Sequence, residues 1–144
     1  MKTIIIFLTF ILLGTSYAQN LKIKDIPQNV RDKFNSSYSN ATNVKWTKEK
    51  AGYESSFKKG SVDMSVIFDE KGNIVETETV IQLSYLPVEV RESVAKDYSK
   101  YKISEAAKIE SRGIISYEVE VKRGKDKIEL VYDEHGVLKS KHKL

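Results

Sequence analysis

The stretch 117–136, "YEVEVKRGKDKIELVYDEHG", repeats the pattern of 53–72, "YESSFKKGSVDMSVIFDEKG", which lies 64 positions earlier. Each copy has an alternating apolar run, a basic pair followed by glycine, a second alternating run, and then Asp-Glu, one further residue and glycine. Such alternation is typical of β-strands with one buried face, and turns that end in glycine are typical of hairpins. The stretch therefore predicts two antiparallel hairpins built from a duplicated segment.

A helix is predicted ahead of the strands in each half. The two prolines, Pro27 and Pro87, stand at the same place in "IPQNVRD" and "LPVEVRE". Proline fits a first helical turn, and Asp25 with Gln28 predicts a capping box for the first helix. Apolar residues then recur every four positions and give each helix one apolar stripe, made of Val30, Phe34 and Tyr38 in the first half and Val90, Val94 and Tyr98 in the second.

Period-two runs predict four strands after each helix. The runs follow one another too closely for crossover helices, so the strands should be antiparallel. A unit of about 60 residues is marginal alone, which favours two units that share one sheet. The predicted fold class is α+β: two tandem helix-plus-four-strand repeats, at about 25–81 and 84–142, forming a mostly antiparallel sheet of about eight strands with two helices on one face.

The alternation also predicts which side chains face the helices. In the first half these include the aromatic residues Trp46, Tyr53, Phe57 and Phe68, so core packing is favoured over an aromatic platform for a sugar or a base. In the second half the same reasoning assigns Ala107 and Ile109 to the helix side, with Ile109 in the place of Trp46. About three residues are predicted to be inserted within "SKYKISE", between the second helix and its first strand.

The chain begins with "MKTIIIFLTFILLGTSYAQN", which has the features of an export signal. Its apolar run is much shorter than the roughly 20 residues that cross a bilayer, so a signal peptide over residues 1–18 is predicted in place of a membrane span. The chain has no cysteine, which excludes a lipid-anchored lipoprotein and disulfides. Residues 19–144 are predicted to form a single exported domain, periplasmic or extracellular.

The charge pattern argues against nucleic-acid binding. The net charge is only +4, and removal of Lys2 with the signal peptide lowers it by one. Lysine and glutamate alternate along most segments, whereas nucleic-acid binders concentrate basic residues on one surface.

These features together resemble the PepSY-like family of exported bacterial proteins, which is related in architecture to β-lactamase-inhibitor protein. The resemblance extends from Ile26 to about Lys141 and is carried by "IPQNV" and "LPVEV", by "NVKWTKEKAGYESSFKKG", and by the turns "FDEKGNI" and "YDEHGVL". The second half departs from the family pattern at Ile109, where an aromatic residue is usual. The resemblance implies a fold and an envelope location, and the inhibitory activity of the distant relative is an analogy.

The sequence contains few residues that could form a catalytic or metal-binding site. His135 and His142 are the only imidazoles, and without cysteine a catalytic triad or a multi-histidine metal site is hard to assemble. The acidic pairs that begin at Asp69 and Asp133 fit turns better than a glycosidase or calcium site. No catalytic residue, metal ligand or cofactor site is predicted.

One feature of the strands points to partner binding. Ile67 and Val131 break the alternation at equivalent positions and put an apolar side chain on the face away from the helices, among charged residues. An apolar centre with a polar surround is typical of protein-binding patches. The main hypothesis is therefore an exported, non-enzymatic module that binds an envelope or secreted protein, with Ile67, Val131, Lys58 and Lys122 as candidate contact residues.

Two other functions remain open at this level. A small-ligand carrier would bind its ligand between the sheet and the helices, in a cavity lined by Phe34, Trp46 and Phe68. A hydrolase would need a base, a nucleophile or metal ligands that the sequence does not offer.

Overall fold

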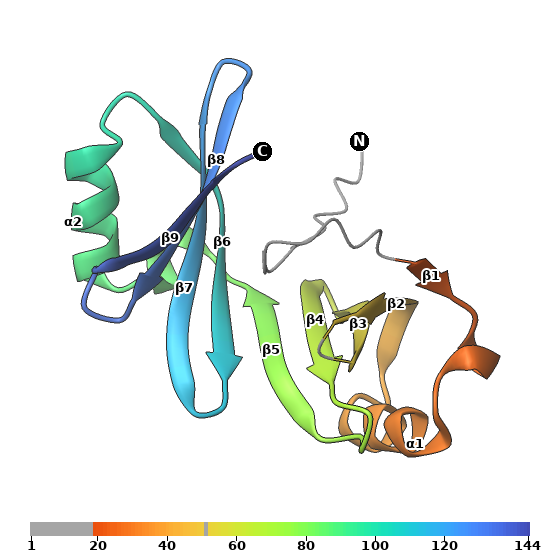
Figure 1. The fold of residues 1–144 in the computed structure, drawn as a ribbon. Coiled ribbons are helices and arrows are strands. Elements are labelled where there is room, and N and C mark those ends of the chain that lie inside the picture. The colour runs from red at the N-terminus through yellow and green to blue at the C-terminus, as the bar shows by residue number, and fades with distance from the viewer. Residues whose placement is uncertain (1–18, 51) are drawn as a thin grey trace.

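The computed structural model describes residues 19–50 and 52–144, which form two α-helices and one nine-stranded sheet (Figure 1). The first half contains β1 (Gln19–Leu21), the short 3-10 helix η1 (Ile23–Asp25), α1 (Gln28–Ser37), β2 (Ala41–Glu49), β3 (Gly52–Lys59), β4 (Val62–Phe68) and β5 (Ile74–Val80). The second half contains η2 (Leu83–Tyr85), α2 (Val88–Asp97), β6 (Lys102–Ser111), β7 (Ile114–Arg123), β8 (Asp126–Asp133) and β9 (Leu138–Lys143). The predicted α+β class with tandem repeats is confirmed.

The strands follow one another across the sheet in chain order, and all neighbouring strands are antiparallel. Eight of them are the predicted strands. The ninth, β1, is a short edge strand that pairs with β2 through Leu21 and Trp46. It has only three residues, too few for a periodic signal. The predicted signal peptide, residues 1–18, lies outside the described residues.

Both helices cover the same face of the sheet, as predicted. One row of paired residues runs across six strands on that face: Phe57, Met64, Thr79, Lys108, Tyr117 and Tyr132. At the β3 end of the row, Phe34 of α1 stacks edge-on against Phe57. At the β8 end, Val94 of α2 shares a cluster with Tyr132. In Figure 1, α2 lies at the left and α1 at the lower right, so the opposite, helix-free face turns towards the centre of the molecule.

Each half has its own buried cluster beneath its helix. The first is built from Ile26, Val30, Phe34, Trp46, Phe57, Val66 and Phe68. The second is built from Leu86, Val90, Val94, Ala106, Val119, Val121, Leu130 and Tyr132. The two halves are joined where β5 pairs with β6, from Glu76 opposite Ser111 to Val80 opposite Ala107. The sheet therefore continues across the joint while the apolar packing is divided in two.

The Asp-Glu-x-Gly turns fix the helices to the sheet. Asp69 Oδ1 accepts hydrogen bonds from the backbone N–H groups of Lys71 and Asn73, and Gly72 has a φ of +83°. Asn29 of α1 donates its side-chain N–H to the Glu70 carbonyl at 3.0 Å. In the second half Ser93 of α2 donates to the Gly136 carbonyl at 2.7 Å, and Gly136 has a φ of +75°. The predicted turns, with glycine in the left-handed region, are confirmed.

The predicted capping box of the first helix is wrong. Asp25 ends the 3-10 helix η1, and its carboxylate accepts a hydrogen bond from the Lys22 N–H at 3.3 Å. Helix α1 has no side-chain cap, and its first backbone bond runs from the Arg31 N–H to the Pro27 carbonyl at 3.1 Å. The short 3-10 turn ahead of the proline takes up the acidic residue that the sequence pattern assigned to α1.

The predicted insertion between α2 and β6 is also wrong. Trp46 pairs with Ser55 in the first half, and Ala106 pairs with Val119 in the second, so Ala106 takes the place of Trp46. The additional residues lie at the tip of the β6–β7 hairpin, where Glu110 pairs with Ile115 and Ser111 with Ile114. Because β5 pairs with this same part of β6, the longer hairpin lengthens the joint between the two halves.

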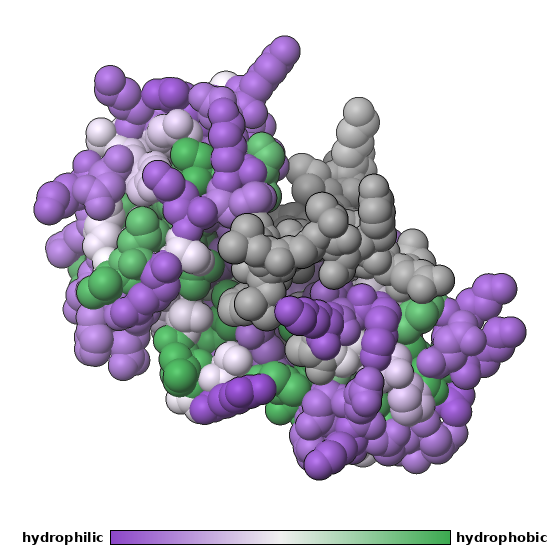
Figure 2. Space-filling model, viewed as in Figure 1, coloured by the Kyte–Doolittle hydropathy of each residue, from purple (hydrophilic) through white to green (hydrophobic). Residues whose placement is uncertain are grey.

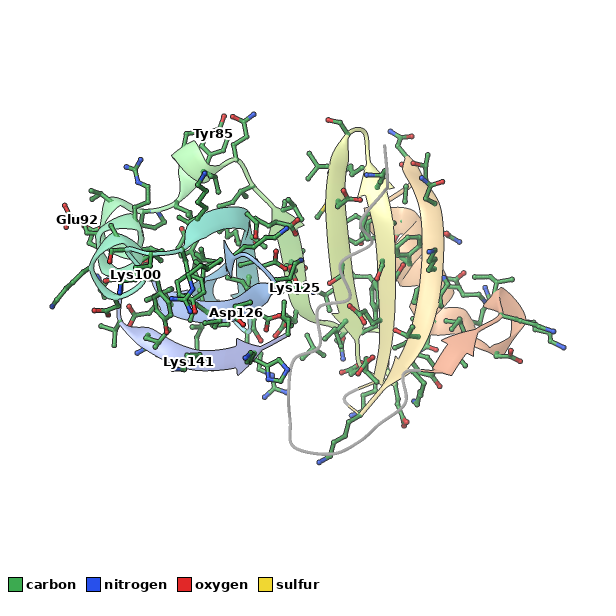
Figure 3. The ribbon with its side chains drawn as sticks, turned by 90° about the horizontal axis from the view of Figure 1, so that it is seen from above. Tyr85, Glu92, Lys100, Lys125, Asp126 and Lys141 are labelled. Atoms are coloured by element: carbon green, nitrogen blue, oxygen red, sulfur yellow. The ribbon has the colours of Figure 1, made fainter. Side chains whose placement is uncertain are left out.

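The surfaces of the two halves differ as well. Tyr85 at the end of η2 is exposed and projects from the molecule (Figure 3), whereas the corresponding end of η1 carries Asp25. Within residues 19–50 and 52–144 no helix has the length and apolarity needed to cross a membrane.

Candidate protein-binding face

On the helix-free face, residues that are paired on neighbouring strands form rows across the sheet. The first row contains Thr47, Glu54, Ile67, Glu76 and Ser111. The next contains Ser65, Glu78, Ile109 and Ser116, and a third contains Val80, Ala107, Glu118, Val131 and Ser140. Ile67 therefore lies between two glutamates, and Val131 lies beside a third.

The four candidate contact residues all lie on this face but do not form one cluster. Ile67 on β4 and Val131 on β8 are separated by three strands, about 19 Å across a flat sheet, and they also stand in different rows. Lys58 lies nearer the β3–β4 hairpin and pairs with Asp63 at 2.7 Å. Lys122 is exposed at the matching end of β7, opposite Lys127 of β8. The apolar pair thus lies inside the face and the lysines lie at its rim.

Ile109 and Ala107 were assigned to the wrong face by the sequence. Ile109 pairs with Glu78 on one side and Ser116 on the other, so it lies on the helix-free face, where only 3% of it is exposed. Assigning the β6 residues by their distance from the β6–β7 turn would have predicted this orientation, because Ile109 then pairs with a polar residue of β7, Ser116. The apolar side chains of this face, called the apolar strip below, are Ile67, Val80, Ala107, Ile109 and Val131. Val80 pairs with Ala107, whereas glutamates stand next to Ile67, Ile109 and Val131 in the strand register. Ala107 and Ile109 are buried, and the other three are half-buried.

Seven glutamates gather on the helix-free face and form an acidic cluster. The strand alternation predicted Glu54, Glu118, Glu120 and Glu129 on this face, but it did not predict a cluster of seven. Its members are Glu54, Glu76, Glu78, Glu105, Glu118, Glu120 and Glu129. Glu105, Glu120 and Glu129 stand directly opposite one another on three adjacent strands. Among the side chains described, Lys127 is the cation paired with the cluster, with its Nζ 3.1 Å from both Glu120 carboxylate oxygens. The sequence hides the cluster because its members come from five separate strands.

The electrostatics of the cluster follow from burial and mutual repulsion. Burial raises the pKa of Glu118 to about 10, and the carboxyls of Glu78 and Glu129 add to the effect. Burial, followed by the neighbouring Glu54 and Glu76, likewise raises the pKa of Glu78 well above its ordinary value. Both groups favour the protonated form because their charge is poorly solvated and faces other carboxylates.

The acidic cluster predicts that the protein is more stable at pH 5 than at pH 8. The folded state holds protons on Glu78 and Glu118 that the unfolded chain, with an ordinary Glu pKa near 4.5, releases. Their contribution is therefore complete below about pH 4.5 and is lost as the pH rises through the raised pKa of each group, which for Glu118 is about 10. We expect the free energy of unfolding, measured by urea titration, to fall by several kcal/mol between pH 5 and pH 8, since each group contributes about 1.4 kcal/mol per pH unit in this range.

The Glu78→Gln/Glu118→Gln variant is the control for this dependence, because glutamine keeps the shape of the protonated acid. Its unfolding free energy should change much less with pH and exceed that of the unaltered protein at pH 8.

Two turn aspartates do not affect this comparison. Hydrogen bonds from Asn73 and Lys139 lower the pKa of Asp69 and of Asp133, respectively, so their contribution to the folding stability is lost only as the pH falls below about 4. A stability that rises steadily from pH 5 to pH 8 would contradict the interpretation.

The two histidines are exposed and lie in different elements. His135 is an exposed turn residue whose backbone N–H donates to Asp133, as expected for a loop position. His142 lies on the edge strand β9, opposite Glu129. In the part of the chain that the structure describes, no group of three or more acidic or histidine side chains is arranged to hold a metal ion.

The space proposed for a small ligand is filled by protein. The ring centroid of Phe34 lies 5.1 Å from that of Trp46 and 6.3 Å from that of Phe68, and the other two centroids are 6.0 Å apart. Rings at these distances are in direct contact. The residues named as the lining of a cavity are therefore the centre of the first core cluster.

Comparison with protein families identifies the chain. The family model described as "Putative beta-lactamase-inhibitor-like, PepSY-like" matches residues 15–76 and again residues 51–140, which together span most of the sequence. The chain belongs to the PepSY-like family. The two overlapping matches agree with the two structural repeats of this PepSY-like protein. No functionally curated protein matches it.

Solved structures from Bacteroides share the fold of this PepSY-like protein. A "putative periplasmic" protein of B. eggerthii has 18% identity and a TM-score of 0.74, over 82% of this chain and 88% of its own. A DUF2874 family protein of B. uniformis has 20% identity and a TM-score of 0.72, over 81% and 88%. A BLIP-like protein of B. fragilis has 24% identity and a TM-score of 0.65, over 83% and 86%. At these identities the likeness concerns the fold alone.

Proposed function

We propose that this PepSY-like protein is an exported, non-enzymatic module that binds another envelope or secreted protein through its helix-free face. The observation that supports the proposal is the composition of that face. The residues of its apolar strip alternate with glutamates across paired strands, and three of them, Ile67, Val80 and Val131, keep part of their surface exposed. Rigid strands hold such a patch in one geometry, which lowers the entropic cost of binding.

The space-filling view agrees with a surface of mixed character. On the side of the molecule seen in Figure 2, apolar side chains appear in small groups between hydrophilic ones rather than as one continuous belt. Interfaces of proteins that also exist free in solution have this composition. Export is supported by the leader-like start of the sequence and by the "putative periplasmic" description of the B. eggerthii protein.

Replacing Ile67 and Val131 together with aspartate should abolish capture of the partner from envelope extract. Each aspartate would put a charge into the apolar strip, and the one at position 67 would stand between Glu54 and Glu76. Capture is measured by pull-down, and far-ultraviolet circular dichroism checks that the fold is kept. Because the added repulsion can disturb the sheet, the neutral Ile67→Gln/Val131→Gln variant is tested beside it and should also lose capture.

Val88→Asp is the matched control, because Val88 is exposed on α2 and therefore lies on the other side of the sheet. It makes the same change of chemistry away from the proposed interface and should leave capture intact. Retained capture by both folded double variants would rule out the helix-free face as the binding surface.

A further inference from the structure

The distribution of charge on the helix-free face is unusual for this chain. The protein carries a net charge of +4, yet the face collects the seven glutamates of the acidic cluster. Like charges directly opposite one another on neighbouring strands destabilise a sheet, and Glu105, Glu120 and Glu129 form such a row. The lysines of this face include Lys58 at the rim and a row near one edge in which Lys102, Lys122 and Lys127 stand opposite one another on β6, β7 and β8. The face therefore gathers acidic groups inside a partly basic rim, at a cost in stability.

Two members of the acidic cluster are buried without a partner. Glu78 and Glu118 are each 6% exposed. In the described part of the chain neither accepts a hydrogen bond nor forms an ion pair, whereas the cluster member Glu54 accepts one from Thr47 at 3.2 Å. An unpaired charge at such a buried place is destabilising by several kcal/mol, so without a cationic partner both carboxyls favour the neutral form. Both side chains stand on the helix-free side of their strands, next to the apolar strip.

We propose that the occupant of the helix-free face is a cationic protein segment whose Lys or Arg side chains enter between the glutamates and whose aliphatic side chains cover the apolar strip. The inference rests on the proposed function, since it names the chemistry of the partner for the same face. Rows such as Glu54–Ile67–Glu76 alternate acidic and apolar groups at the spacing of neighbouring strands. Arginine is the best match, because its guanidinium binds a carboxylate through two hydrogen bonds.

Other occupants fit the face less well. A nucleic acid would be repelled, because its phosphates would meet the acidic cluster. A divalent cation needs several oxygens within one coordination sphere, and no such group occurs in the chain from residue 19 onward, residue 51 excepted. A protein segment can instead place separate cations along the sheet, one for each gap between carboxylates.

The experiment selects peptides of about 15 residues from a random displayed library on the purified protein. The most enriched peptide is synthesised with a fluorophore, together with a version in which every Lys and Arg is replaced by Gln. Affinities are measured by fluorescence anisotropy. The test variant is Glu78→Gln/Glu118→Gln, which keeps side-chain shape but cannot ionise when a cation docks. The control is Glu70→Gln/Glu134→Gln, which removes two exposed turn carboxylates outside the cluster.

We expect the enriched peptides to be rich in Lys or Arg and to alternate them with aliphatic residues. The Glu78→Gln/Glu118→Gln variant should bind the peptide about tenfold or more weakly, and the Gln version of the peptide should lose binding to a similar degree. Raising the salt from about 50 to about 250 mM should also weaken binding severalfold. The control variant should bind as the unaltered protein does.

The other outcomes separate this inference from the proposed function. The enriched peptides could instead be neutral or acidic, and lose binding to the Ile67→Gln/Val131→Gln variant but not to the Glu78→Gln/Glu118→Gln variant. This result would contradict a cationic partner and still support the face as an interface. Failure to enrich any peptide, or enriched peptides insensitive to both double variants, would overturn both.

Proton release gives a second readout of the same contact. Glu118 faces Glu78, Glu105, Glu120 and Glu129, and burial raises its pKa. Lys127 pairs with Glu120, and His142 of β9 lies opposite Glu129. A docked guanidinium would favour the charged carboxylate and displace its proton. Affinity for the basic peptide should therefore rise severalfold from about pH 6 to about pH 8 in the unaltered protein, and stay flat in the Glu78→Gln/Glu118→Gln variant. A flat profile in the unaltered protein would contradict direct contact with these two groups.

Discussion

Replacing Gly52 with alanine is expected to destabilise the protein by roughly 3 to 5 kcal/mol. Gly52 opens β3 with a φ of +145°, which side chains with a Cβ rarely adopt. A Cβ at this position would lie 1.9 Å from the Phe68 carbonyl oxygen and 2.9 Å from its carbonyl carbon. These are backbone atoms of β4, so the clash cannot be relieved by rotating a side chain. Phe68 belongs to the first core cluster, and moving its backbone would disturb that packing.

The second half supplies the control for this substitution. Ser116 takes the corresponding place in β7, since it pairs with Ile109 near the hairpin as Gly52 pairs with Glu49. It already has a Cβ, so Ser116→Ala should change the unfolding free energy by no more than about 0.5 kcal/mol. Urea denaturation followed by circular dichroism measures both. Equal stability of the two variants would show that β3 and β4 are not as close as described.

Replacing Phe34 with alanine should lower the unfolding free energy by roughly 3 to 5 kcal/mol. The Phe34 ring lies 5.1 Å from Trp46, 5.2 Å from Phe57 and 5.6 Å from Tyr38, measured between centroids. Alanine would leave a cavity at the centre of these rings and remove their edge-to-face contacts. The corresponding change in the second half, Val94→Ala, removes a smaller side chain and should cost roughly 1 to 3 kcal/mol.

The Phe34→Ala variant also tests the prediction that residues 19–144 fold as a single domain. Each half has its own core, but a unit of about 60 residues buries too little surface to be stable by itself. We therefore expect one cooperative transition in both variants, with circular dichroism and tryptophan fluorescence giving the same midpoint. Since Trp46 reports on the first half alone, a fluorescence midpoint below that of circular dichroism would reveal two independent domains.

The repeat was readable from the sequence because each of its parts has a local cause. Glycine at positions 72 and 136 is needed for the left-handed turn residue, and Asp69 and Asp133 bind the turn backbone. Alternation in β3, β4, β7 and β8 reflects one buried and one open side, so the predicted core residues Phe57 and Phe68 lie under α1. Local interactions of this kind produce patterns that can be recognised in the sequence.

The register of β6 was not readable in the same way. "ISEAAKIES" contains apolar residues on both sides of the strand, Ala106 towards the helices and Ile109 towards the open face. Its alternation therefore fits either assignment. Only the length of the β6–β7 hairpin, set by pairing with β5 and β7, decides between them.

The sequence by itself determined the duplicated helix-and-hairpin unit, the antiparallel order and the side of the sheet that the helices cover. These follow from turn chemistry and from periods of two and about four, which act between residues close in the chain. Only the tertiary structure decided that the packing divides into two cores and that glutamates from five strands meet on one face. Both features depend on which strands become neighbours in the sheet. These contacts join residues far apart in the chain, so no local sequence pattern predicts them.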